Sequence, residues 1–217
     1  MHIYLIRHGR QDTILCNDVV GLAKEGREQA RILGQRMINY GVDALYASTL
    51  IRAKETAQII KEELIKAGKF TKEQPIELRR DLREIDFGTL EGYKNEEIPI
   101  LFKDFVKRRD DMTEDLAFPE GECGQQVWER SIKVLQEIVE SKYKKVAVVT
   151  HGGVIRSLLS GILGMDQANK LLFCKDLENC SITELYYRKD RNRLYVERIN
   201  DYAHIENSPH LLRDGWI

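Results

Sequence analysis

The sequence has almost no net charge, few cysteines and no long apolar run, and each absence excludes a class of protein. In 217 residues, 34 Lys and Arg oppose 35 Asp and Glu, so the formal net charge is -1. Proteins whose main partner is nucleic acid or an anionic membrane carry a surplus of basic residues. We therefore expect neither nucleic acid nor a membrane as a partner.

No stretch approaches the roughly 20 apolar residues of a membrane-spanning helix. The opening residues, Met1 to Ile6, lack the basic flank and the length of a signal peptide. Four cysteines are scattered without a Cys-x-x-Cys pair: Cys16, Cys123, Cys174 and Cys180. This spacing is typical of reduced thiols, not of a disulfide framework or a zinc site. We expect a cytoplasmic protein without a bound metal.

Two common catalytic motifs are also missing. No Gly-x-Ser-x-Gly turn occurs, which disfavours a serine hydrolase. No Gly-x-x-x-x-Gly-Lys-Ser/Thr run occurs, which disfavours a P-loop kinase.

Short apolar segments alternate with segments of helical spacing. Strands are predicted over 3–6, 43–47 and 146–150, and the last is apolar throughout, as strands covered on both faces are. A hairpin is predicted at the end of the chain, from 181–188 and 193–199 around a polar turn.

Helices are predicted over 24–40, with Gly41 as the C-cap, and from Ser48, as the N-cap, to Gly68. Apolar spacing predicts a long helix around 127–139 and another over 154–163. These elements together favour an α/β fold, a three-layer α/β/α sandwich with a mostly parallel central sheet.

One domain over 1–217 is expected, because a chain of this length can close one substantial core. Residues 93–120 interrupt the regular order with dense charges of both signs above a few aromatic residues. This segment is predicted as a surface insertion with a short helix, a helical lid.

Two of the five histidines follow predicted strands and precede glycine, in Arg7-His8-Gly9 and Thr150-His151-Gly152-Gly153. Open α/β sheets bind ligands at the carboxyl ends of their strands. Glycine lets backbone N–H groups approach a ligand, and the helix after Gly153 directs its positive dipole end there. If the two strand ends are neighbours, both imidazoles and Arg7 converge on an anion.

Two further segments fit the same edge. Arg52 is predicted in the first turn of a helix, where a cation is disfavoured unless an anion is near. Glu84 and Asp86 follow an expected edge strand. Each residue alone has an ordinary structural explanation, such as a solvated charge or a surface ion pair. Their joint occurrence at one sheet edge favours a functional site.

Four motifs in this order resemble the histidine phosphatase (phosphoglycerate mutase-like) superfamily. The resemblance covers nearly the whole chain. The motifs are Arg7-His8-Gly9, Ser48-Thr49-Leu50-Ile51-Arg52-Ala53, Leu82-Arg83-Glu84 with Gly88-Thr89-Leu90-Glu91-Gly92, and Thr150-His151-Gly152-Gly153-Val154-Ile155-Arg156.

The resemblance implies that His8 is a nucleophile that becomes phosphohistidine, with Arg7, Arg52 and His151 around the phosphoryl group. It also implies that Glu84 protonates the leaving oxygen, with Asp86 as the rival for that role. Arginine forks neutralise phosphate oxygens, and backbone N–H groups near Gly152 add donors. The reaction would then need neither a metal nor another cofactor.

The first loop, residues 10–17 after the Arg7-His8-Gly9 motif, departs from the family pattern. Arg10 adds a positive charge at the expected pocket mouth, where it contacts a second anionic group of the substrate or is simply solvated. Asn17 is the candidate for an asparagine that family members carry closer to the motif. Both are retained as candidate substrate-binding residues, beside Arg7, Arg52 and Gly152.

The chemistry places three demands on this site. His8 must be neutral to attack, so its other ring nitrogen is expected to donate to a backbone carbonyl. Arg7 and His8 can serve one site only if the strand ends at about Arg7, since adjacent strand residues point to opposite faces. Glu84 must carry a proton when it acts as an acid.

The expected function is that of a metal-independent phosphomonoesterase, a histidine-type acid phosphatase that acts on a small phosphorylated metabolite. Mutases of the family carry Arg-x-Tyr-Gly after the acid, whereas this chain has Ile85-Asp86-Phe87-Gly88. This favours the phosphatase branch, which includes α-ribazole phosphatase-like proteins. The alternatives are a cofactor-dependent phosphoglycerate mutase and a weakly active relative that binds phosphorylated ligands. A homodimer is left open.

Overall fold

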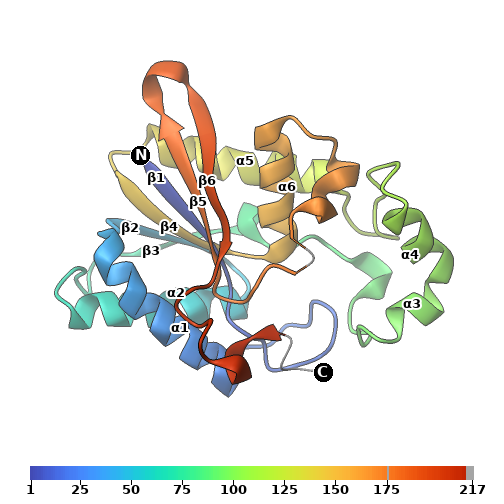
Figure 1. Ribbon diagram of the computed structural model, residues 1–217, viewed down its shortest axis with the longest axis horizontal. Helices are drawn as coiled ribbons and strands as arrows, with labels where there is room; N and C mark the ends of the chain where they lie inside the picture. Colours follow the sequence, from blue (N-terminus) through green and yellow to red (C-terminus); the bar gives the residue numbers. More distant parts are fainter. Residues whose placement is uncertain (175, 214–217) are drawn as a thin grey trace.

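The computed structural model describes residues 1–174 and 176–213. Within them, six strands form one mixed sheet in the order β3-β2-β4-β1-β5-β6 (Figure 1). The first four of this order are parallel to one another, β5 is antiparallel to β1, and β6 is antiparallel to β5. The strands are β1 His2–Arg7, β2 Ala44–Ser48, β3 Ile76–Arg79, β4 Lys145–Thr150, β5 Ile182–Arg188 and β6 Arg193–Asp201.

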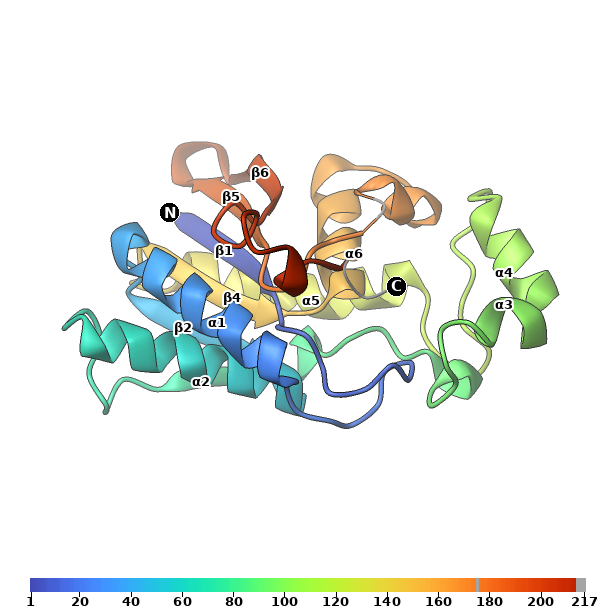
Figure 2. The ribbon, with the colours of Figure 1, turned by 60° about the horizontal axis from the view of Figure 1, so that its bottom comes forward.

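Helices cover both faces of the sheet, so the predicted three layers are confirmed. Figure 2 shows α1 and α2 on one side of the strands, with α5 and α6 on the other. The four helices are α1 Lys24–Met37, α2 Ile51–Lys66, α5 Gly124–Glu140 and α6 Gly152–Leu163. The predicted helix 24–40 finishes as a 3-10 turn, and Gly41 follows with a φ of 64°, the left-handed conformation that a C-cap glycine adopts.

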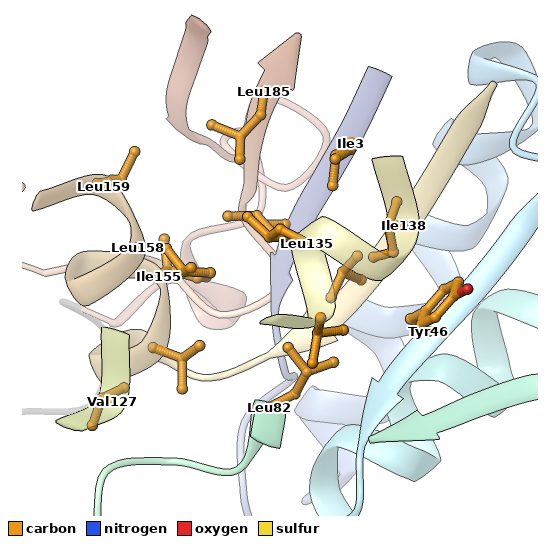
Figure 3. Packing of buried hydrophobic residues seen from close by; sticks show 14 of the residues in the cluster. Ile3, Tyr46, Leu82, Val127, Leu135, Ile138, Ile155, Leu158, Leu159 and Leu185 are labelled. Atoms are coloured by element: carbon orange, nitrogen blue, oxygen red, sulfur yellow. The ribbon is translucent and has the colours of Figure 1, made fainter. Parts of the chain in front are cut away.

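The two central strands supply both halves of the core by alternation. Ile3 and Leu5 face α5 and α6, whereas Tyr4 and Ile6 face α1 and α2. Figure 3 shows Ile3 packed among Leu135, Ile138 and Leu185. This double-sided burial anchors β1 and β4 at the centre of the sheet and fixes where their carboxyl ends lie.

The expectation that Ser48 caps a helix is wrong. The pairing of β2 with β3 continues through Ser48 and Arg79, which keeps Ser48 in the strand. The helix therefore begins later, at Ile51, with Leu50 as its N-cap. The buried hydroxyl of Ser48 is turned instead toward the second histidine motif.

The segment 93–120 contains two short helices, not the single one expected: α3 Ile98–Leu101 and α4 Lys103–Asp110. Both lie at the end of the molecule beyond α6 (Figures 1 and 2). The ring of Phe105 lies 5.2 Å from the ring of Phe118, tilted by 45°, and packs against the core on the side of α5 and α6. Among the described residues, no helix has the length and apolar character to cross a membrane.

Candidate active site

The two histidine motifs lie side by side because β1 and β4 are adjacent parallel strands. Arg7 is in register with Thr150, and the His8 N–H donates to the Thr150 carbonyl over 3.0 Å. The ring centroids of His8 and His151 are 5.0 Å apart, and both side chains are buried. Strand β1 ends at Arg7, as the shared site requires, so His8 is free of the alternation of the strand.

The contacts of His8 fix its tautomer. Its Nδ1 donates to the Gly9 carbonyl over 2.7 Å, which matches the expected backbone partner. Its Nε2 accepts from Arg52 Nε over 3.2 Å, so the lone pair lies on Nε2. Burial, followed by the charges of Arg52 and Arg7, lowers the pKa of His8 well below its usual value. The imidazole is therefore neutral near pH 7.

Arg52 stands in the first turn of α2, as predicted, and is almost fully buried. Its Nη1 donates to the Asp18 carbonyl over 3.1 Å, and its Nη2 donates to Asn17 Oδ1 over 2.6 Å. Asn17 in turn donates to Glu91 over 2.6 Å. The first loop thus orients the guanidinium beside His8 through Asn17, and burial lowers the pKa of Arg52.

Two buried nitrogens of this group have no hydrogen-bond partner in the described part of the chain: Arg7 Nε and His151 Nδ1. A Cβ on Gly152 would lie 3.7 Å from Arg7 Nε, so the space beside this glycine adjoins the guanidinium. Burial, with the charge of Arg213, lowers the pKa of Arg7 to about 9. A site with unsatisfied donors and excess positive charge favours an anion.

His151 is oriented by Ser48, whose Oγ lies 2.8 Å from Nε2. The same oxygen accepts the Leu50 N–H over 3.3 Å, which leaves its proton available to Nε2. In that arrangement the ring proton of His151 is on Nδ1, the unpartnered nitrogen, and can be donated to a phosphate oxygen. Burial, followed by coupling to the nearby His8 and the charges of Arg52 and Arg7, lowers the pKa of His151 well below its usual value.

Glu84 belongs to the loop that follows β3, and its half-buried side chain lies against the first residues of α6. Its Oε1 accepts the Ile85 N–H over 2.9 Å, and its Oε2 accepts the Gly153 N–H over 3.3 Å. A cavity of about 210 Å³ beside it is lined by both Glu84 and Asn17. Asp86 Oδ1 instead accepts the Gly88 N–H over 2.8 Å within its own turn. Of the two carboxylates, Glu84 is the one held at α6.

Arg10, next in sequence to the first histidine motif, contacts a helix residue and a residue near the end of the described chain. Its N–H donates to Gln29 Oε1 over 2.8 Å, and its Nη2 donates to the Leu212 carbonyl over 3.4 Å. A contact with a second anionic group of the substrate stays a prediction.

Arg156 lies close to the site, although sequence reasoning assigned it no role. Its Nη2 donates to the Cys174 carbonyl over 2.9 Å, and burial lowers its pKa. A Cβ on Gly152 would lie 4.0 Å from Arg156 Nη1. The signal was present in the sequence, because residues four apart share one face of a helix.

In the part of the chain that the structure describes, no three His, Cys, Asp or Glu side chains are grouped so as to hold a metal ion. Two neutral imidazoles, two guanidiniums and a carboxylate around one point match the requirements of phosphoryl transfer through histidine.

The comparisons with known proteins agree with this class. The family model of the histidine phosphatase superfamily (branch 1) matches residues 3–201. The chain therefore belongs to the histidine phosphatase superfamily, with a role as a phosphatase or a mutase.

A probable phosphoglycerate mutase GpmB of Erwinia tasmaniensis is 27% identical over 218 residues, which is 96% of each chain. The solved mycobacterial glucosyl-3-phosphoglycerate phosphatase with inorganic phosphate has a TM-score of 0.78 at 22% identity, over 94% of this chain and 99% of that one. A phosphoserine phosphatase mutant from Entamoeba histolytica in complex with phosphoserine has a TM-score of 0.72 at 25% identity, over 94% and 98%.

Proposed function

We propose that this protein is a metal-independent phosphomonoesterase that acts through a phosphohistidine at His8. The observation that carries the proposal is the pair of contacts on one imidazole. Nδ1 donates to the Gly9 carbonyl, while Nε2 keeps its lone pair toward Arg52. A buried imidazole that is neutral and oriented in this way is a ready nucleophile.

In the first step, His8 Nε2 attacks the phosphorus of a monoester, and the bond from phosphorus to the leaving oxygen breaks. The Nε–H of Arg52, which contacts Nε2 in this structure, is placed to turn to a phosphate oxygen. Arg7 Nε and His151 Nδ1 supply further donors. Glu84 gives its proton to the leaving oxygen. Because two guanidiniums balance the charge of the phosphoryl group, the step needs no metal.

In the second step, the Glu84 carboxylate takes a proton from water, which attacks the phosphohistidine and releases phosphate and neutral His8. The half-buried Glu84 lines an open cavity among polar side chains, a position that water can reach. Access for water favours hydrolysis over return of the phosphoryl group to a substrate. We therefore rank the phosphatase above the mutase.

We propose a small phosphorylated metabolite as the substrate. A similar solved protein is named as a phosphoserine phosphatase and holds phosphoserine, a small monoester. The lowered pKa of His8 keeps the nucleophile neutral in more acidic solution than an ordinary histidine, which supports activity in acid. Four free cysteines support a reducing, cytoplasmic location.

The test is a panel of phosphorylated metabolites and p-nitrophenyl phosphate, with phosphate release measured for the wild type and for His8→Ala. We expect the variant to lose at least about 10³-fold in activity. An acid-labile phosphoenzyme should accumulate in rapid-quench samples of the wild type only. The matched control is His210→Ala, an exposed histidine beside Glu28, which should keep full activity. Activity that survives in His8→Ala would refute the assignment.

The mutase is the second candidate, because a relative is named as a probable phosphoglycerate mutase. Incubation with 3-phosphoglycerate and a trace of 2,3-bisphosphoglycerate separates the two. Efficient formation of 2-phosphoglycerate without release of phosphate would establish the mutase. Binding of phosphorylated ligands with no turnover on any substrate would instead establish a weakly active relative.

A further inference from the structure

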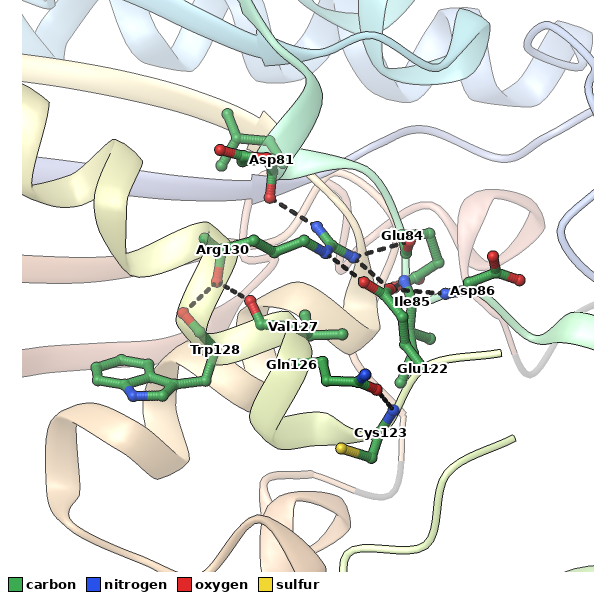
Figure 4. Close-up of polar contacts among 12 residues, drawn as sticks. Asp81, Glu84, Ile85, Asp86, Glu122, Cys123, Gln126, Val127, Trp128 and Arg130 are labelled. Carbon is green, nitrogen blue, oxygen red and sulfur yellow. Dashed lines mark hydrogen bonds and ion pairs between the residues drawn. The ribbon is translucent and has the colours of Figure 1, made fainter. Parts of the chain in front are cut away.

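A bidentate ion pair, Arg130 with Glu122, lies beside the segment that carries Glu84 and lines the same cavity (Figure 4). Arg130, on α5, donates from Nε to Glu122 Oε1 and from Nη2 to Glu122 Oε2, each over 2.8 Å. The side chains of Arg130 and Glu122 are 18% and 24% exposed, so the pair is largely shielded from water. Neither residue belongs to the group around His8.

The remaining hydrogen-bonding capacity of this pair is directed at the backbone of residues 81–86. Arg130 Nη1 donates to the Asp81 carbonyl over 2.6 Å, and Nη2 donates to the Glu84 carbonyl over 3.1 Å. Glu122 Oε2 accepts the Asp86 N–H over 3.0 Å. The segment is thus held at three positions, one of which is the residue assigned as the acid.

Glu122 stays ionised over the pH range of the histidine chemistry. Burial raises the pKa of Glu122, but the hydrogen bond from Arg130 and the Asp86 N–H outweigh it, and the pKa is lowered. A bidentate guanidinium–carboxylate pair fixes both partners in one plane. The backbone that this pair holds therefore has a defined position relative to α5.

Glu122 also connects this position to the end of the insertion 93–120. Its N–H donates to the Asp86 carbonyl over 2.9 Å, and the Thr89 N–H donates to the Pro119 carbonyl over 3.0 Å. The backbone at Gly121 lies directly against the backbone at Asp86, so close that a Cβ on Gly121 would overlap the Asp86 carbonyl. The ion pair of Arg130 and Glu122 therefore connects three parts of the chain: helix α5, the end of the insertion 93–120, and the segment 81–86 that carries Glu84.

We propose that Glu122 and Arg130 are positioning residues that set the carboxyl group of Glu84 for proton transfer to the leaving oxygen. The inference rests on the proposed function, in which Glu84 is that acid. Catalysis is sensitive to such support, since a displacement of about 1 Å can lower a rate about 100-fold.

Positioning of an acid has a signature that general destabilisation lacks. A basic leaving group needs a proton in the transition state, whereas an acidic phenol departs as the anion. Loss of the ion pair should therefore slow phenyl phosphate much more than p-nitrophenyl phosphate. The two substrates have nearly the same size, so their ratio isolates proton transfer from binding.

The experiment measures kcat/KM for both substrates in the wild type, Arg130→Lys and Glu122→Gln. Lysine keeps the charge but loses the fork that reaches Glu122 and two carbonyls together. Glutamine keeps the shape of Glu122 but loses its charge. We expect kcat/KM for phenyl phosphate to fall about 10- to 100-fold in both variants, with a much smaller change for p-nitrophenyl phosphate.

The matched control is Arg79→Lys. Arg79 forms the same kind of bidentate pair, with Glu137 on α5, but holds no part of the segment 81–86. This variant should keep the wild-type ratio between the two substrates, and thermal unfolding should show all variants folded. An equal loss on both substrates, or no loss on either, in the two ion-pair variants would overturn the positioning role.

The Glu84→Gln variant separates this inference from the proposed function. In a Glu84→Gln background, Arg130→Lys should have no further effect on the substrate ratio, because the acid is already gone. A further change in the ratio would overturn the inference while the phosphatase assignment stood. Wild-type activity that does not depend on His8 would overturn the proposed function itself.

Discussion

Arg52 Nε donates to His8 Nε2 over 3.2 Å, so a cation faces the lone pair that attacks phosphorus. This contact has two consequences. It holds the imidazole in its neutral form, and it keeps a donor where phosphate oxygens arrive. The same guanidinium thus acts on the nucleophile before the reaction and on the phosphoryl group during it.

Removal of the Arg52 charge should therefore move the pH profile. The charge of Arg52 lowers the pKa of His8, second only to burial. In Arg52→Gln we expect the pKa of His8 to rise, which shifts the acidic limb of kcat/KM to higher pH. Arg52→Lys keeps the charge, so the acidic limb of kcat/KM should stay at its wild-type pH. Both variants should lose about 100-fold in kcat/KM, since each loses the planar guanidinium that donates several N–H groups to the phosphoryl oxygens. An unshifted limb in Arg52→Gln would contradict this account.

Ser48→Ala should weaken catalysis without unfolding the protein. The Ser48 hydroxyl is 2.8 Å from His151 Nε2 and fixes which ring nitrogen carries the proton. Loss of one such hydrogen bond corresponds to roughly 5- to 10-fold in kcat/KM. Ser160→Ala is the control, because Ser160 is also buried but its Oγ has no partner among the described residues. Equal activities of the two variants would argue against the role of Ser48.

Stability should fall as the pH drops from 7 to 5. Burial and Arg36 lower the pKa of His204 from 6.5 to about 4, and the pKa values of His8 and His151 are also lowered. Below about pH 6.5 the unfolded chain binds protons that the folded chain does not, so acid favours unfolding.

His204 alone costs up to about 2 kcal/mol of unfolding free energy at pH 5, and His8 and His151 act in the same direction. Urea unfolding at the two pH values measures the total, and His204→Gln should reduce the pH dependence. His210→Gln, at an exposed histidine, is the control for replacing a histidine as such. Equal stability at pH 7 and pH 5 would contradict the prediction.

The sequence alone could predict which edge of the sheet carries the catalytic residues, because that location depends on the topology of the strands and not on side-chain contacts. Parallel strands bring their carboxyl ends to one edge, so His8 and His151 could be assigned to the same edge, while the adjacency of their strands stayed a condition. The strand predicted over 146–150 is apolar throughout, and this pattern likewise predicted a sheet covered on both faces.

Side-chain partners that come from distant loops could not be predicted in this way. Arg10 is turned toward the carbonyl of Leu212, near the other end of the sequence. The pairing of Arg130 with Glu122 depends on how the insertion returns to α5, and no local pattern encodes that return. Ser48 was misplaced because its strand pairing with β3 overrides its preference for a helix cap.

Gly153→Ala should impair proton transfer at an unstrained helix position. A Cβ on Gly153 would overlap Glu84 Oε1 and come within 3.0 Å of Ile85 Cγ2, so the carboxyl group must move. We expect kcat/KM for phenyl phosphate to fall about 10- to 100-fold, more than for p-nitrophenyl phosphate. Stability should change little, because alanine is otherwise the better helix former.

Gly152→Ala is the informative comparison at the same helix end. Its Cβ would meet no atom closer than Arg7 Nε at 3.7 Å, so it leaves Glu84 in place. It would, however, occupy space beside the proposed phosphate site and can weaken substrate binding. The ratio between the two substrates should therefore stay at the wild-type value in Gly152→Ala and change in Gly153→Ala. The same ratio in both variants would mean that the position of Glu84 does not limit the reaction.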